Sequence, residues 1–156
     1  PNAQPEVLVA IGGLAGTSAT TGLRTPTITR TRFVVGTTAN TDFTANDANA
    51  QIEVEITFDE QVTVTGSPQL TVTNNDASGG GYGNLTLAYV SADSTANQLR
   101  FRKTSAGIGN TDVMTVSTLA LNGGTIRDTA AAAAGNTVNA TLTYGSGIAV
   151  SKTVAS

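Results

Sequence analysis

Residues 51–72, QIEVEITFDEQVTVTGSPQLTV, decide the fold that this sequence predicts. Apolar and polar residues alternate through the first part of the stretch. The apolar set is Ile52, Val54, Ile56 and Phe58, and the polar set is Glu53, Glu55, Thr57 and Asp59. A period of two is typical of a β-strand that buries one face. We therefore expect the apolar set to face a core and the charged set to face solvent.

The same stretch contains two further short strands. Residues 59–61 interrupt the alternation, which resumes over residues 62–65 with valines on one face and threonines on the other. Residues 66–68, Gly-Ser-Pro, break the chain again, and another alternating run follows from residue 69. Three short strands within about twenty residues favour a sandwich, because each strand then buries one face against a second sheet.

Two segments of the chain resemble a bacterial and phage surface repeat of immunoglobulin-like sandwich type. The first is Ile56–Val72, ITFDEQVTVTGSPQLTV, and the second is Leu119–Asp128, LALNGGTIRD. Between the second segment and Gly135-Asn136 the chain has an Ala-rich stretch that is slightly longer than the repeat normally has. The resemblance covers roughly Pro26 to Leu142. It implies a module of an adhesin, a giant surface protein or a virion, and it implies no catalytic residues.

Length and composition indicate one domain with a thin core. The chain has 156 residues, of which 12% are charged and 4% aromatic. A domain of this size buries about two-thirds of the surface of its unfolded chain. We predict an all-β, immunoglobulin-like antiparallel β-sandwich of about seven to nine strands over residues 26–156. The predicted core positions are Ile56, Phe58, Val64, Leu70, Leu87, Phe101 and Leu142.

The residue types that are missing exclude several kinds of site. The sequence has no Cys and no His, which excludes disulfides, thiolate nucleophiles, zinc–sulfur sites and a Ser-His-Asp triad. The net charge of −3 argues against nucleic acid as a partner, because nucleic-acid-binding domains are normally basic. No apolar run has the 18 or more residues of a membrane helix. We expect no cofactor.

Two alternatives that involve acidic residues remain open. A carboxylate-pair hydrolase needs two acidic groups about 5 to 10 Å apart in a cleft, and Asp59-Glu60 is the nearest candidate. Since these two are neighbours in a predicted turn, we expect no enzymatic activity. Calcium is the second alternative. The loop residues that could bind it are Asp42, Asp47, Asp59, Asp93 and Asp128. Their spacing is not that of an EF-hand, and the sequence leaves a metal site undefined.

Residues 1–25 precede the predicted sandwich and read as an N-terminal arm. The arm contains a short apolar run, and the residues that we expect to contact a partner are Val7, Leu8, Val9 and Ile11. A continuous apolar patch on a surface usually marks a contact. The alternatives are an edge strand of the same domain and simple disorder.

A small basic cluster follows the arm. It consists of Arg24, Arg30 and Arg32, and the last two lie on the same side of an alternating strand over residues 27–35. One interpretation is a contact with an acidic surface of a partner protein. The simpler interpretation, which we consider the stronger of the two, is a solvated strand face.

The function that these observations favour is a non-enzymatic structural or interaction module. The chain shows no internal repeat, so a single module on a phage particle is the favoured setting: a capsid decoration or accessory surface protein that its arm attaches to a capsid or other virion protein. A homo-oligomer is also compatible with the sequence. The alternative is an extracellular repeat of a bacterial adhesin or surface protein, stabilised by calcium.

Overall fold

The computed structural model describes residues 25–35, 38–39, 43–44, 50–130, 139–140 and 151–155. These residues form an all-β structure with one turn of 3-10 helix, η1 (Ser91–Asp93), between two of the strands. The predicted fold class is therefore confirmed. The predicted arm, residues 1–25, lies outside the described part except for its last residue.

Nine of the described strands have four residues or more, which matches the predicted number of strands. They are β1 (Ile28–Val35), β4 (Ala50–Phe58), β5 (Val62–Thr65), β6 (Gln69–Asn74), β7 (Leu85–Tyr89), β8 (Gln98–Ala106), β9 (Val113–Ala120), β10 (Thr125–Asp128) and β11 (Ser151–Ala155). Two further strands, β2 (Thr38–Ala39) and β3 (Phe43–Thr44), have two residues each.

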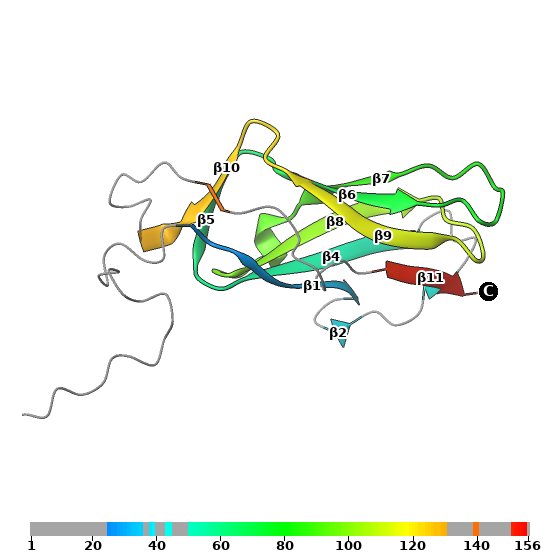
Figure 1. The fold of residues 1–156 in the computed structure, drawn as a ribbon, viewed down its shortest axis with the longest axis horizontal. Helices are drawn as coiled ribbons and strands as arrows, with labels where there is room; N and C mark the ends of the chain where they lie inside the picture. The colour runs from blue at the N-terminus through cyan, green and yellow to red at the C-terminus, as the bar shows by residue number, and fades with distance from the viewer. Residues whose placement is uncertain are drawn as a thin grey trace, which may run out of the picture.

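Most of the strands belong to one curled sheet. Its strand order is β2-β1-β4-β8-β7-β6-β9-β11-β3, and its pairs are antiparallel except for β11 with β3. The two strands at the ends of this order, β2 and β3, are four residues apart in sequence, from Ala39 to Phe43, so the chain holds them within about 15 Å of each other. The sheet must therefore curl back on itself, and Figure 1 shows it folded over a shared interior. This arrangement is a β-sandwich closed along one side by β7 and β8.

The core lies between the two halves of the curled sheet. Strand β4 contributes the four apolar residues of its alternating pattern, which are 0–1% exposed. The predicted core positions Ile56, Phe58, Leu70, Leu87 and Phe101 are all buried, and Val64 is partly buried against the same cluster. Leu142 lies outside the described residues. The ring of Tyr89 packs on that of Phe101 with centroids 5.8 Å apart.

The two segments that resemble the surface repeat meet in space. Each contributes one strand to a second, two-stranded sheet in which β5 pairs with β10, with Thr65 opposite Thr125. The chain enters β10 through a turn with positive φ at Asn122 (49°) and Gly123 (80°), and Gly124 N donates to Leu121 O at 2.8 Å. Positive φ at both central residues defines a type I′ turn, for which Asn-Gly is the preferred sequence.

The structure corrects one expectation for β4. Glu53 and Glu55 alternate with the core residues, as predicted, but they do not face solvent: each is only 1% exposed. In β1, Thr31 and Phe33 are buried, and Ile28 and Val34, which lie at alternate positions to them, are buried as well. The outer side of β4 is therefore covered at both glutamates, and the side chains that cover them define the candidate site.

Candidate interaction site

Three neighbouring strands bring opposite charges together on the outer side of the sheet. β1 carries Arg30 and Arg32, β4 carries Glu53 and Glu55, and β8 carries Arg100 and Arg102. In each strand the two residues are two positions apart, so they point to the same face. The register places Glu55 between Arg32 and Arg100 and sets Glu53 opposite Arg102. We call these six residues the arginine–glutamate face.

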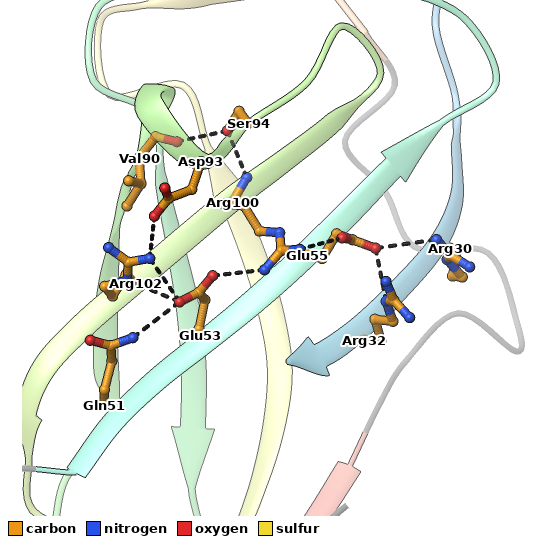
Figure 2. Close-up of polar contacts among 10 residues, drawn as sticks. All are labelled: Arg30, Arg32, Gln51, Glu53, Glu55, Val90, Asp93, Ser94, Arg100 and Arg102. Atoms are coloured by element: carbon orange, nitrogen blue, oxygen red, sulfur yellow. Dashed lines mark hydrogen bonds and ion pairs between the residues drawn. The ribbon is translucent and has the colours of Figure 1, made fainter. Parts of the chain in front are cut away.

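Glu55 is the centre of this face, because three arginines converge on its carboxylate. Its Oε1 accepts hydrogen bonds from Arg32 Nε at 2.8 Å and from Arg30 Nη2 at 3.2 Å. Its Oε2 lies 2.9 Å from Arg100 Nη2, as an ion pair without the alignment of a hydrogen bond. Figure 2 shows the two arginines of β1 reaching Glu55 from one side and Arg100 from the other.

Glu53 organises the other end of the face. Its Oε1 accepts a hydrogen bond from Arg100 Nη1 at 2.8 Å, and its Oε2 accepts one from Arg102 Nε at 2.9 Å and one from Gln51 at 3.1 Å. Arg102 also pairs with Asp93 of η1 (Figure 2). Arg100 therefore bridges both glutamates, while Arg102 connects Glu53 to the adjoining turn.

The turn that carries Asp93 is itself fixed to β8. Ser94 Oγ donates to Val90 O at 2.8 Å and accepts from the backbone N–H of Arg100 at 2.9 Å. Val90 N also donates to Arg100 O at 2.8 Å. These bonds hold the backbone at Arg100 in place, so the side chains of β8 project toward the glutamates from a supported position (Figure 2).

Burial and charge act in opposite directions on these groups. Burial raises the pKa of Glu55, but the hydrogen bond from Arg32 and the charges of Arg32, Arg100 and Arg30 outweigh it, so the pKa of Glu55 lies below its ordinary value. Burial lowers the pKa of Arg102, and its hydrogen bonds to Asp93 and Glu53 outweigh that effect and raise the pKa. Glu55 is therefore ionised at neutral pH in spite of its burial.

The predicted partner-binding residues fall into two groups. Arg30 and Arg32 belong to the arginine–glutamate face, where the structure pairs both with Glu55 of their own chain. The remaining predicted contacts lie outside the described residues; they are Val7, Leu8, Val9, Ile11 and Arg24.

The acidic residues considered for calcium do not form a metal-binding group in the described part of the chain. Asp59 binds Thr27, accepting from its N–H at 2.8 Å and from its hydroxyl at 2.6 Å. Asp93 pairs with Arg102, and Asp128 accepts from Ala130 N at 2.8 Å. The described residues contain no group of three or more Asp or Glu side chains placed to hold a metal ion. Asp42 and Asp47 lie outside them.

One buried carboxylate was not singled out from the sequence. Asp112 is fully buried and accepts three hydrogen bonds, each 2.9 Å long, from Ser78 N, Gly109 N and the side chain of Asn74. Burial raises its pKa, but these bonds outweigh burial and lower the pKa to about 2. Asp112 thus ties the loop after β6 to the loop before β9. Its position in a polar loop carries no signal of this role.

Comparison of the chain with family models, with curated proteins and with solved structures found no match. Within the described residues, no helix is long and apolar enough to cross a membrane.

Proposed function

We propose that the protein is a non-enzymatic structural or interaction module that is displayed on the surface of a larger assembly. A phage virion is the favoured setting, with the chain as a capsid decoration or accessory surface protein. The arm, residues 1–25, would attach the module to a capsid or other virion protein. An extracellular repeat of a bacterial adhesin is the alternative setting.

The observation that carries this proposal is the arginine–glutamate face. Its ion pairs cross three strands and hold the partly exposed arginines Arg30, Arg32 and Arg102 in place, which gives the sheet an ordered, charged patch on its outer side. Such a surface loses little conformational entropy on contact with a partner, because its side chains are already held in place. It is suited to protein–protein contact more than to chemistry on a small molecule.

Localisation tests the proposal directly. Antibodies against the folded chain, labelled with gold, should decorate the surface of particles purified from the organism that makes the protein. Decoration of the bacterial surface would instead support the adhesin alternative. Label that is confined to the cell interior and absent from every assembly would refute both settings.

The role of the arm is tested by attachment. A chain without residues 1–24 should melt nearly as the full chain does but fail to join the assembly. A chain in which only the apolar residues Val7, Leu8, Val9 and Ile11 are replaced by serine should behave in the same way. If the truncated chain unfolds, the segment is an integral strand. If it folds and still attaches, the partner is held by another surface.

The effect of calcium on the melting temperature also distinguishes the virion setting from the adhesin setting. A calcium-stabilised repeat should show a saturable rise of more than a few degrees in melting temperature on addition of millimolar calcium, because a ligand that binds only the folded state raises its stability. For the virion module we expect no dependence of the melting temperature on calcium, with magnesium as the matched control.

A further inference from the structure

The charge on the arginine–glutamate face is unevenly distributed. Four of the chain's eight Lys and Arg residues lie on it, although the whole chain has a net charge of −3. Together with Asp93, which pairs with Arg102, the face holds four arginines and three carboxylates. The local excess is therefore one positive charge. An acidic protein that gathers half of its cations in one place has a surface that attracts anions.

The excess positive charge lies at the β1 end of the arginine–glutamate face. At the β8 end, Arg102 has two carboxylate partners, Glu53 and Asp93. At the β1 end the relation is reversed, because Arg30 and Arg32 share the single oxygen Oε1 of Glu55. The side chains of these two arginines are 50% and 29% exposed, whereas that of Arg100 is 8% exposed.

Within the described residues, the two arginines also keep N–H donors that no hydrogen bond uses. A guanidinium has five N–H groups in a planar fork. The bonds to Glu55 use only Nη2 of Arg30 and Nε of Arg32. Because both side chains leave β1 on the same face, two residues apart, their Cα atoms are about 7 Å apart and their guanidinium groups meet at one carboxylate oxygen (Figure 2). A second carboxylate placed beside them could accept hydrogen bonds from both guanidinium groups.

We propose that Arg30 and Arg32 form a carboxylate-binding site on the outer face of β1, which takes an Asp or Glu side chain of a protein partner. Arginine forks match carboxylates in geometry, and charge-assisted hydrogen bonds of this kind are stronger than neutral ones. A monoanion matches the single excess charge. A phosphate dianion would exceed it and would meet the nearby carboxylates of Glu55 and Glu53.

Glu55 acts in this site as a positioning residue. It holds both guanidinium groups against the sheet, and its lowered pKa keeps it ionised at neutral pH. The inference rests on the proposed function, since it names the chemistry of the partner at that surface. It can nevertheless fail alone, because the binding measured below does not depend on where the protein is found.

The experiment is a titration of the full chain, labelled with nitrogen-15, with a short glutamate-rich peptide at constant ionic strength. The Nε–Hε signals of Arg30 and Arg32 should shift saturably with this peptide and not with the matched glutamine peptide. Arg30→Gln should weaken binding roughly fivefold or more, the effect of losing one charge-assisted hydrogen bond at a partly exposed site. Arg30→Lys, which keeps the charge but loses the fork, should give an intermediate loss.

Lys103→Gln is the matched control. It removes one positive charge from β8 outside the arginine–glutamate face, and it should change the affinity less than twofold. An equal loss in Lys103→Gln and Arg30→Gln would overturn the proposal, because binding would then follow net charge alone. Tighter binding of inorganic phosphate than of the glutamate peptide at the same two arginines would also overturn it. If Arg30→Gln does not fold, Arg30→Lys and the two wild-type peptide titrations still decide the question.

Discussion

Glu55→Gln is the substitution that tests the arginine–glutamate face most directly. Glutamine has nearly the shape of glutamate but lacks the charge, so the variant removes the attraction to three guanidinium groups without opening a cavity. Breaking a buried ion pair costs about 3–5 kcal/mol, because the remaining charge stays buried without a partner. Here Arg30 and Arg32 are partly exposed and recover hydration, and Arg100 keeps its bond to Glu53. We therefore expect a loss of about 2–3 kcal/mol in the free energy of unfolding at pH 7.

The effect should depend on pH with a definite sign. The pKa of Glu55 in the folded chain lies below the ordinary value of 4.5. A carboxyl group with a lowered pKa contributes stability that is fully present above its unfolded pKa and is lost as the pH falls through its folded pKa. The difference between wild type and Glu55→Gln should thus be constant near neutral pH and should shrink once the pH falls below about 4.5.

Chemical denaturation followed by circular dichroism, repeated from pH 7 down to pH 2, measures this difference. In a separate thermal melt near neutral pH, the melting temperature should fall by roughly 4–12 °C, at about 2–4 °C per kcal/mol for a domain of this size. Asp93→Asn is the matched control. Its carboxylate is 45% exposed, so its loss should cost less than about 1 kcal/mol. Equal costs for the two variants, or a Glu55→Gln cost that does not change with pH, would refute the assignment of Glu55 as the buried centre of the face.

Three further predictions concern the framework, and denaturation in urea checks each. Phe58→Ala should cost about 3–5 kcal/mol, because Phe58 is 1% exposed in the core; a loss under about 1 kcal/mol would contradict that burial. Asp112→Asn should cost about 2 kcal/mol at neutral pH, because it places an amide N–H against the donors that hold this carboxylate. Since the pKa of Asp112 is about 2, that cost should fade as the pH drops from about 4 to about 2, and a cost that persists at pH 2 would argue against it. Gly124→Ala should cost about 1–3 kcal/mol, because a Cβ there would collide with the carbonyl oxygen of Thr65, whereas Gly83→Ala, in open space, should be nearly neutral; similar costs for both would show that the contact is not tight.

The alternating pattern of β4 predicted its inward face correctly and its outward face wrongly. The period of two says which residues share a face, and the apolar set Ile52 to Phe58 had to be buried. It does not say what lies beside the strand. Glu53 and Glu55 are buried because β1 and β8 place arginines opposite them. Those arginines lie more than twenty residues from the glutamates in the sequence, and the alternation within β4 alone does not reveal the pairing.

A signal for the face was nevertheless present. The sequence contains Arg-x-Arg at residues 30–32, Glu-x-Glu at residues 53–55 and Arg-x-Arg at residues 100–102, each within an alternating strand. Cross-strand pairs of opposite charge stabilise sheets, so these three pairs favour β1, β4 and β8 as neighbours in that order. Asp112 had no comparable signal, because its partners are mostly backbone N–H groups whose position depends on two folded loops.

The segments Ile56–Val72 and Leu119–Asp128 meet where β5 pairs with β10, and glycines are required where their backbones approach closely. Gly66 has a φ of 71°, and a Cβ on it would lie 2.7 Å from the Cα of Gly124. A glycine is required at such a position in any chain whose backbones approach this closely, whatever that chain binds. The arginines of the face lie on β1 and β8, outside both segments. Arg30 and Arg32 lie outside this contact, so the proposed carboxylate site can be varied without changing the glycines that the fold requires.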